Sequence, residues 1–238
     1  MRIGIARDQR RRRYMEDRHT AGDVAGGTVL GVFDGHVGAA VAEHAAAEAL
    51  AAIHAALARG LDGEPLWRAV FAGLDADAQE CGSTATLVLV RGSEVSAAWV
   101  GDSRALLVSA TGREVLTPDH RLGRVDEHRR VTAAGAMILP PYACDPRTGN
   151  GLMVTRSLGD RALRSIGIVA DPEVARARAG PGAVGVVVAT DGLWDVVDED
   201  RAAGVCRTLD PQAAAGRLVA EVAERDGRDN VTVLVARF

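Results

Sequence analysis

The sequence predicts an α+β fold, a four-layer α-β-β-α sandwich in which two central antiparallel sheets are flanked by helix pairs. Apolar, strand-like runs follow one another closely in the middle of the chain. Two helical segments lie between the early strands, and two more precede the last strand. A doubly wound parallel sheet would instead alternate strand and helix regularly. The chain has 238 residues, and no linker-like stretch divides it, so we expect a single domain over 1–238.

The first half of the chain should begin with a strand, continue with two helices and end in a series of strands. Residues 29–33 are a short apolar run, 38–58 are rich in alanine, and Trp67, Val70 and Phe71 recur at helical spacing. The predicted elements are a strand at 29–33, helices at 38–58 and 64–80, and strands at 84–90, 94–100, 104–109 and 114–116.

The second half should contain one exposed helix, a loop, and then the last strands and helices. Pro140 and Pro141 mark the loop, and Pro211 suits the first turn of a helix. The predicted elements are a helix at 124–134, a loop at 140–150, strands at 152–155, 173–178 and 183–189, helices at 198–209 and 211–225, and a strand at 231–238.

Composition excludes several classes of function. All 28 basic residues are arginine, so neither a Schiff-base lysine nor the lysine of a P-loop is available. The net charge of −4 and 3% aromatic content argue against nucleic-acid binding. The three cysteines are an odd number and have no CxxC spacing, which argues against a disulfide framework or a zinc site. This favours a location in the reducing cytoplasm. No apolar stretch reaches the length of a membrane span.

Four predicted strands carry an aspartate at one end. Asp34, Asp102 and Asp191 follow apolar runs, and Asp229 comes just before the last strand. If these ends meet, the carboxylates need cations, because like charges at close range raise one another's pKa. Mg²⁺ and Mn²⁺ prefer such oxygen ligands, and a pair of them can clamp a phosphoryl group.

A simpler interpretation exists for each aspartate alone, because aspartate and Asp-Gly are common in turns. A helical segment follows Asp34-Gly35, however, so a hairpin is excluded there.

His36, two residues beyond Asp34, could act as a general acid. The guanidinium of Arg12 could grip a phosphate, although the basic cluster around it could equally be a solvated patch. The remaining histidines are expected to be structural, and Trp99 and Trp194 to lie in the core.

These segments resemble the metal-dependent serine/threonine protein phosphatases of the PP2C type, also called the PPM family. The matching motifs occur in family order over nearly the whole chain, and DGHVG is closer to the eukaryotic-like branch than to the DGMGG of many bacterial members; we expect a bacterial source. The motifs are RRRYMED, VFDGHVG, GSTATLVLV, AAWVGDSRALL, LTPDHR, GLMVTRSLGD, VVVATDGLWDVV and RDNVTVLVARF.

The resemblance implies a role for each matched residue. Asp34 would bridge two Mn²⁺ or Mg²⁺ ions, and the Gly35 carbonyl would be a further ligand. Arg12 would hold the substrate phosphate and His36 would protonate the leaving oxygen. The other implied metal-site residues are Asp191 and Asp229 as ligands of one ion, Glu16 and Asp17 as holders of metal-bound waters, and Asp102 as a ligand of a third, weaker ion shared with Asp191.

The resemblance also implies direct attack of a metal-bridged water on phosphorus, without a phosphoenzyme. The expected substrates are phosphoserine and phosphothreonine in proteins, opposite a Ser/Thr kinase, with a monomeric enzyme and no nucleic-acid or membrane partner. Only 11 residues precede Arg12, which predicts a short or trimmed N-terminal strand.

Two other functions remain open from the sequence. One is a sensor or binding module that keeps the fold without catalysis; it should have lost some of the metal carboxylates, and here all are present. The other is the same chemistry on a phosphorylated small molecule.

Overall fold

The computed structural model, which describes every residue except 76, 77 and 79, contains two five-stranded antiparallel sheets. The first has the order β1-β16-β15-β8-β9 and the second β14-β7-β6-β3-β2. The first sheet comprises β1 (Arg2–Asp8), β8 (Arg104–Ser109), β9 (Arg113–Val115), β15 (Ala183–Ala189) and β16 (Val231–Arg237). The second comprises β2 (Arg18–Val24), β3 (Gly27–Phe33), β6 (Ala85–Arg91), β7 (Glu94–Val100) and β14 (Glu173–Arg178).

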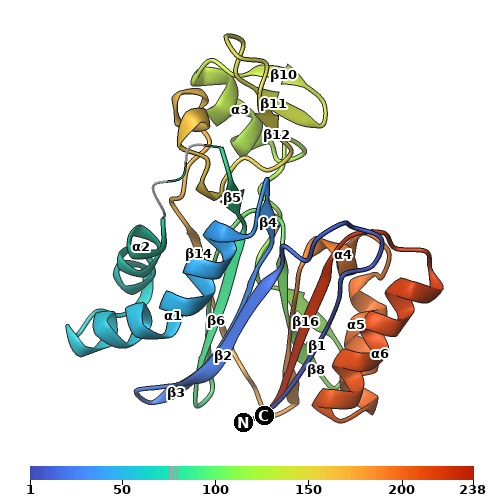
Figure 1. Cartoon of the computed structure of the whole chain (residues 1–238). Helices are drawn as coiled ribbons and strands as arrows, with labels where there is room; N and C mark the ends of the chain where they lie inside the picture. Colours follow the sequence, from blue (N-terminus) through green and yellow to red (C-terminus); the bar gives the residue numbers. More distant parts are fainter. Residues whose placement is uncertain (76–77, 79) are drawn as a thin grey trace.

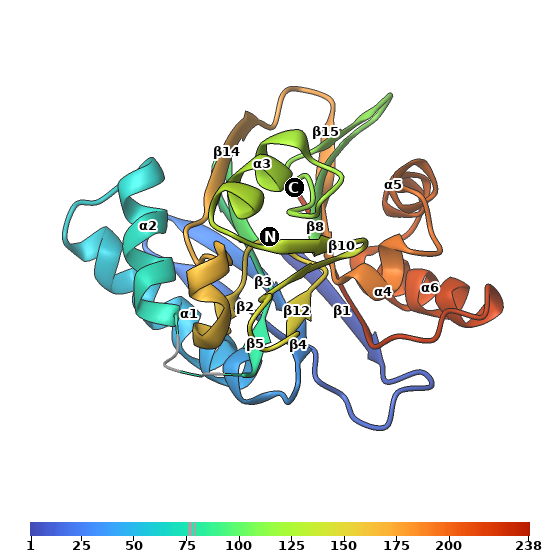
Figure 2. The same ribbon diagram turned by 90° about the horizontal axis from the view of Figure 1, so that it is seen from above.

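Helix pairs cover the outer faces of the two sheets (Figures 1 and 2). Helices α1 (Ala40–Ala58) and α2 (Gly63–Leu74) lie against the second sheet. Helices α5 (Glu199–Thr208) and α6 (Pro211–Glu224) lie against the first, beside the short α4 (Asp191–Trp194). The predicted four-layer sandwich is therefore confirmed.

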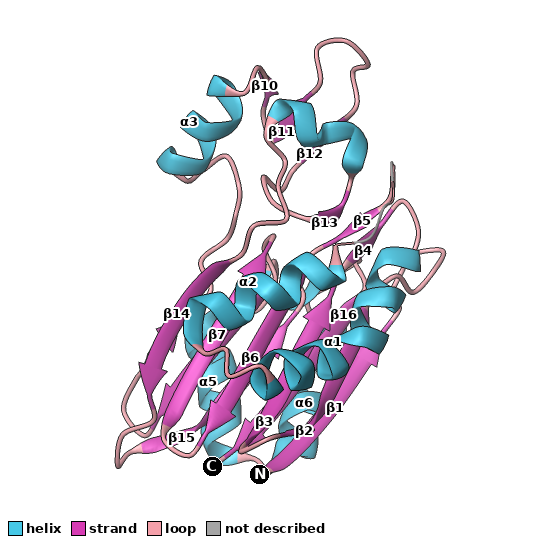
Figure 3. Ribbon diagram, turned by 90° about the vertical axis from the view of Figure 1, so that its left-hand side faces the viewer, coloured by secondary structure: helices cyan, strands magenta, loops and turns pink. Residues whose placement is uncertain are grey.

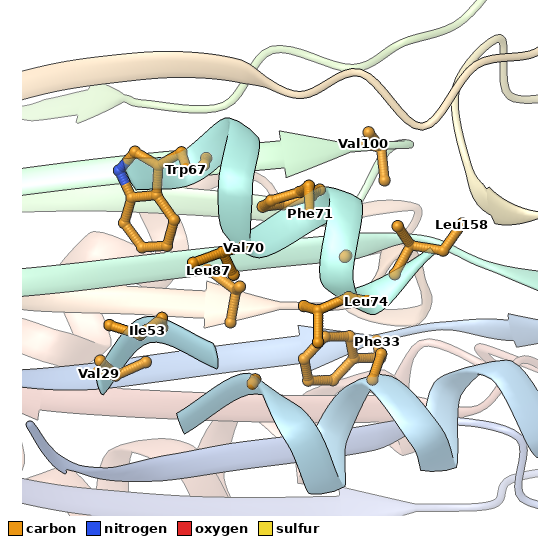
Figure 4. Packing of buried hydrophobic residues seen from close by; sticks show 14 of the residues in the cluster. Val29, Phe33, Ile53, Trp67, Val70, Phe71, Leu74, Leu87, Val100 and Leu158 are labelled. Atoms are coloured by element: carbon orange, nitrogen blue, oxygen red, sulfur yellow. The ribbon is translucent and has the colours of Figure 1, made fainter. Parts of the chain in front are cut away.

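Three apolar layers hold the sandwich together. Between the sheets, residues such as Leu30, Val88 and Leu234 form a buried cluster. Beneath α1 and α2, Trp67 and Phe71 pack towards the second sheet (Figure 4). A third cluster fills the space between the first sheet and the helices α5 and α6. Strands of the sheets are thus apolar on both faces, as a central layer requires.

Residues 120–168, which we call the flap, rise from one end of the sandwich, opposite the two termini (Figures 1 and 3). A small core of its own holds the flap, formed by residues such as Val131, Ala143 and Ile168. Its elements are α3 (Val125–Ala133), β10 (Met137–Leu139), β11 (Tyr142–Cys144), β12 (Gly151–Leu152), β13 (Leu158–Gly159) and the 3₁₀ helix η1 (Arg161–Ile166). β13 pairs with β5 (Gly82–Ser83), which pairs with β4 (Gly35–His36).

Several predicted boundaries are wrong. The helix expected over 64–80 ends at Leu74, because Asp75 adopts an extended conformation and binds the flap through Gly159 and Arg164; residues 76, 77 and 79 of that prediction lie outside the described residues. The loop expected at 140–150 contains β11, and the strand expected at 152–155 is reduced to β12.

The N-terminal strand, expected to be short, has seven residues. β1 pairs along all seven of its residues with β16, and β2, which was not predicted, pairs with β3. Both strands carry several charged or small residues and lie at sheet edges, so their hydrophobic pattern is weak. Among the described residues, no helix has the length and apolarity needed to cross a membrane.

Candidate active site

The four strand-end aspartates line one cavity of about 300 Å³ at the flap end of the sandwich. Asp34 follows β3, Asp102 follows β7, Asp191 begins α4 after β15, and Asp229 precedes β16. The two sheets thus bring to one place carboxylates that are up to 195 residues apart in sequence, from 34 to 229. Arg12, Glu16, Gly35 and His36 line the same cavity, whereas the predicted Asp17 lies just behind it and is fully buried.

Asp34 and Asp191 are the most strongly perturbed carboxyls of the cavity. Burial, followed by the charges of Asp17, Asp191 and Asp102, holds the pKa of Asp34 well above its usual range. Burial and the charge of Asp102 also raise the pKa of Asp191. Two such groups cannot both ionise at low cost unless a cation lies between them.

Arg121, which the sequence did not single out, supplies positive charge on one side of the cavity. Its Nε donates to Asp102 Oδ2 at 2.6 Å, and its Nη2 donates to Asp191 Oδ2 at 3.1 Å. Arg121 lies in the motif LTPDHR, but that motif does not reveal which carboxylates its last residue will meet. A further cation shared by Asp102 and Asp191 would have to displace this guanidinium.

Arg12 also lines the cavity and lies in the loop between β1 and β2. Its Nη2 contacts Asp229 Oδ2, and this hydrogen bond is the main reason why the pKa of Arg12 is raised. The Arg12 side chain remains 58% exposed. Its guanidinium is therefore accessible to an anion that enters the cavity.

Glu16 and the loop around it are fixed by backbone contacts. Glu16 Oε1 accepts a hydrogen bond from the Gly38 N–H at 2.6 Å, and the Glu16 N–H donates to Asn230 Oδ1 at 2.7 Å. Asn230 Nδ2 also donates to the carbonyls of Gln9 and Tyr14. Asn230, which directly follows Asp229, thus ties the Arg12–Glu16 loop to the cavity.

Of the two carboxylate oxygens of Asp17, one accepts a hydrogen bond and the other has no hydrogen-bond partner among the described residues. The Thr190 hydroxyl donates to Asp17 Oδ2 at 2.8 Å, but among the described residues the buried Oδ1 has no hydrogen-bond partner. Burial raises the pKa of this carboxyl. A buried carboxylate oxygen without a partner is costly, and it would be satisfied by a hydrated cation in the neighbouring cavity. The carboxylate-rich donor set therefore fits Mg²⁺ or Mn²⁺.

Gly35 is buried where the chain approaches itself closely. A Cβ at this position would lie 2.8 Å from the Glu16 carbonyl oxygen, so only glycine fits without a shift of the backbone. The close approach keeps β4 next to the loop that carries Glu16.

His36 is held by a partner that the sequence did not suggest. Its Nε2 lies 2.8 Å from Asp160 Oδ2, and the Ser157 hydroxyl donates to the same oxygen at 2.6 Å. The small sheet β4-β5-β13 creates this contact, because His36 pairs with Gly82, which pairs with Gly159. A Cβ on Gly82 would lie 2.0 Å from Asp160 Oδ2, so a glycine is needed beside the pair.

A second acidic cluster lies outside the cavity, at the base of the flap. Asp126, Glu127 and Glu173 each bring a carboxylate oxygen within 4.8 Å of the others. Arg124 bonds to Asp126 and Glu173, and Arg156 bonds to Glu127 and Glu173. These arginines already compensate the charge, so we do not assign a metal to this cluster.

The histidines expected to be structural differ in burial: His120 is buried, His19 is half-buried, and His44, His54 and His128 are exposed. His120 stacks on Trp99, with ring centroids 5.4 Å apart, and its Nδ1 accepts the Gly101 N–H, which supports the turn before Asp102. Trp99 and Trp194 are both buried. The three cysteines are free, and burial raises the pKa of the Cys206 thiol to about 11.

Comparison with known proteins gives consistent matches. A sequence model described as "Protein phosphatase 2C" matches residues 1–231. "Probable protein phosphatase 2C 45" from Oryza sativa subsp. japonica is 33% identical over 254 aligned residues, covering 99% of this chain and 86% of that protein. "Probable protein phosphatase 2C 59" from Arabidopsis thaliana is 32% identical, covering 99% and 79%.

Solved structures share the fold at lower identity. The serine-threonine phosphatase 2C from Toxoplasma gondii superposes with a TM-score of 0.85 at 22% identity, covering 99% of this chain and 94% of that one. The serine/threonine phosphatase Stp1 from Staphylococcus aureus gives a TM-score of 0.74 at 19% identity, with coverages of 99% and 94%.

Proposed function

The chain belongs to the protein phosphatase 2C family, and we propose that its acidic cavity holds two divalent cations, Mn²⁺ or Mg²⁺, for the hydrolysis of phosphoserine and phosphothreonine. As a member of this family it is a metal-dependent serine/threonine protein phosphatase. The observation that carries the two-ion assignment is the convergence of Asp34, Asp191 and Asp229 on one cavity with Arg12 at its rim.

We assign the ion-holding roles to the carboxylates that line or adjoin the cavity. Asp34 would be shared by both ions, with the adjoining Gly35 as a further ligand, and Asp191 and Asp229 would complete one site. Glu16 and Asp17 would hold ion-bound waters, and Asp102 would contribute to a weaker third site. When bound, such ions lower the pKa of water and stabilise the charge that develops on phosphoryl oxygens.

The protein's own side chains orient and protonate the substrate. Arg12 is exposed at the cavity and can bind the phosphate through two parallel N–H groups. Asp160 engages Nε2 of His36, which leaves Nδ1 to carry the proton for the departing serine or threonine oxygen. Ser157 fixes Asp160 in turn. Because Asp160 is almost fully buried, it can orient the imidazole without contacting the substrate.

The wider assignments extend this proposal. We propose that residues 1–238 form one phosphatase domain, supported by the apolar cluster shared by both sheets, and that the enzyme is a monomer that opposes a Ser/Thr kinase. The three free cysteines suit a reducing compartment such as the cytoplasm.

Two variants test the assignment of the cations. In Asp34→Asn and Asp191→Asn, loss of one carboxylate charge should abolish both tight Mn²⁺ binding, measured by calorimetry, and hydrolysis of p-nitrophenyl phosphate, while circular dichroism keeps the native spectrum. Exposed Asp200→Asn, outside the cavity, is the matched control. Unchanged turnover in either cavity variant would refute the assignment.

A further inference from the structure

A second cavity, of about 380 Å³, lies in the flap beside the acidic one. Leu122, Ile138, Pro140, Pro141 and Met153 form most of its wall. Among the residues that line it, only two are titratable, Arg121 and His128, and neither is acidic. We call this hollow the apolar pocket.

The apolar pocket is the uncovered edge of the flap core. Leu122 and Ile138 pack against the buried cluster of Val131, Ala143 and Ile168, but both remain only partly buried. Nine large hydrophobic side chains are exposed among the described residues, and five belong to the flap: Val125, Met137, Leu139, Tyr142 and Met153. A concentration of exposed apolar side chains on one small element is typical of a binding surface.

The apolar pocket is continuous with the acidic cavity. Arg121 and Met153 line both hollows. The Arg121 guanidinium is held by Asp102 and Asp191, so its aliphatic stem is the part that the two hollows share. Two side chains, Arg121 and Met153, therefore lie between the place where a phosphate would bind and the place where an apolar group would fit.

We propose that the apolar pocket binds a bulky apolar side chain of the phosphoprotein substrate, one to three residues from the phosphorylated serine or threonine. The proposal rests on the proposed function. An extended peptide advances about 3.3–3.6 Å per residue, so a residue within three positions of the phosphorylated one reaches the neighbouring hollow. A small phosphorylated metabolite would be too short to fill both.

The charge of the lining selects an apolar occupant. Arg121 has its guanidinium paired with two carboxylates, so it offers no free charge to an acidic peptide side chain. The rest of the wall, apart from His128, offers carbon atoms and no charged group. A leucine, isoleucine, methionine or phenylalanine would be favoured over a charged or small polar residue by loss of water from both surfaces.

A phosphopeptide panel tests the proposal. Each peptide carries one phosphothreonine in a Gly/Ser background, with a single leucine placed in turn at positions −3 to +3. We expect at least one position to raise kcat/KM by about tenfold over the all-polar peptide, the order expected for filling an apolar pocket. The effect should lie mainly in KM, because the contact is remote from the reacting atoms.

Two variants and a control locate the effect. Ile138→Thr makes the wall polar, and Gly123→Leu adds bulk where a Cβ meets no heavy atom within 4 Å. Each should remove most of the leucine preference and leave p-nitrophenyl phosphate hydrolysis unchanged. Leu139→Thr is the control, because Leu139 is the next residue of β10, is 52% exposed and does not line the pocket.

The outcomes separate the two proposals. A leucine preference that is absent at all positions, or that persists in both Ile138→Thr and Gly123→Leu, would overturn the docking proposal while p-nitrophenyl phosphate hydrolysis upholds the phosphatase. If the protein self-associates, Ile138→Thr abolishes the self-association and no peptide preference is found, the pocket binds a second copy of this chain. That result would also overturn the docking proposal. Lack of Mn²⁺-dependent hydrolysis of every substrate would contradict the proposed function, and the docking proposal with it.

Discussion

At the scale of single residues, the proposed proton transfer from His36 to the leaving oxygen depends on its contact with Asp160. Asp160→Asn should lower kcat for a phosphothreonine peptide by about 10²-fold, the lower end of general-acid contributions. Hydrolysis of p-nitrophenyl phosphate should change little, because p-nitrophenolate leaves without a proton. Steady-state kinetics with both substrates measure the decrease in kcat for each, and the ratio of the two decreases is the result to compare.

Gly82→Ala provides an independent test of the same contact. Its Cβ would lie 2.6 Å from His36 Nε2 and 2.0 Å from Asp160 Oδ2, so it should separate the pair and reproduce the ratio seen with Asp160→Asn. A variant that slows both substrates equally would show that Asp160 supports the fold and does not position His36.

We expect Arg121 to compete with a third cation for Asp102 and Asp191. Arg121→Met leaves Asp102 and Asp191 without their guanidinium, so calorimetry should detect an additional or tighter Mn²⁺ site. Arg104→Met is the matched control, because Arg104 pairs with Asp119 and Glu199 and does not line the cavity. Identical isotherms for Arg121→Met and the wild type would rule out competition between Arg121 and a cation.

At the scale of elements, Glu127 fixes α3 to the base of the flap. The side chain is only 1% exposed; burial opposes its ionisation, but hydrogen bonds from Arg156, Arg130 and Thr155 outweigh burial and lower its pKa. A carboxyl with a lowered pKa stabilises the fold above its unfolded pKa of about 4.5, and this stabilisation is lost as pH falls below that value.

Glu127→Gln should therefore destabilise the flap by about 3 kcal/mol near neutral pH, since it leaves Arg130 without its carboxylate and removes one of the two carboxylates that bind Arg156. Hydrogen exchange of residues 120–168 measures the loss, and the difference from the wild type should shrink as pH falls below about 4.5. The exposed Glu114→Gln is the control. Equal protection of the flap in Glu127→Gln and the wild type would contradict this role.

Elements with a strong local pattern were predictable from the sequence, and those made by tertiary pairing were not. β7, β8, β14 and β15 begin and end at the predicted residues. β2 and β4 were missed, because β2 is an edge strand with a weak hydrophobic pattern, and β4 has only two residues. The end of α2 was misplaced since Asp75 bonds to the flap.

The same distinction between local pattern and tertiary pairing applies to the residues of the candidate site. The convergence of Asp34, Asp102, Asp191 and Asp229 could be predicted, because each lies at the end of a strand. The role of Asp160 could not, because its contact with His36 spans 124 residues and passes through three two-residue strands.

At the scale of the whole molecule, the cavity links stability to pH and metal. Burial raises the pKa values of Asp17, Asp34 and Asp191 above the ordinary value of 3.8, so the metal-free fold retains protons that the unfolded chain has released. Stability without metal should therefore decline as pH rises above about 4. Cations displace these protons, so their stabilising effect should grow with pH.

Thermal melts at pH 5.5 to 8 measure this linkage. A fixed Mn²⁺ concentration, about 100 times its Kd at pH 8, should stabilise the protein by about 2.7 kcal/mol at that pH. The same concentration should give a smaller shift in Tm at pH 5.5, where protons compete for the carboxylates. Asp34→Asn should show little shift at any pH. A Tm shift that is constant or larger at low pH would contradict the assignment of these carboxylates to the cations.

We propose that this chain uses cations in the acidic cavity to remove phosphate from serine or threonine of proteins. The most direct measurement is phosphate release from a phosphothreonine peptide, with and without added Mn²⁺ after removal of metals by a chelator, alongside a panel of phosphorylated metabolites. We predict rapid release from the peptide only when Mn²⁺ is present, and none by Asp191→Asn. Release that is independent of metal, or confined to the metabolites, would contradict the claim.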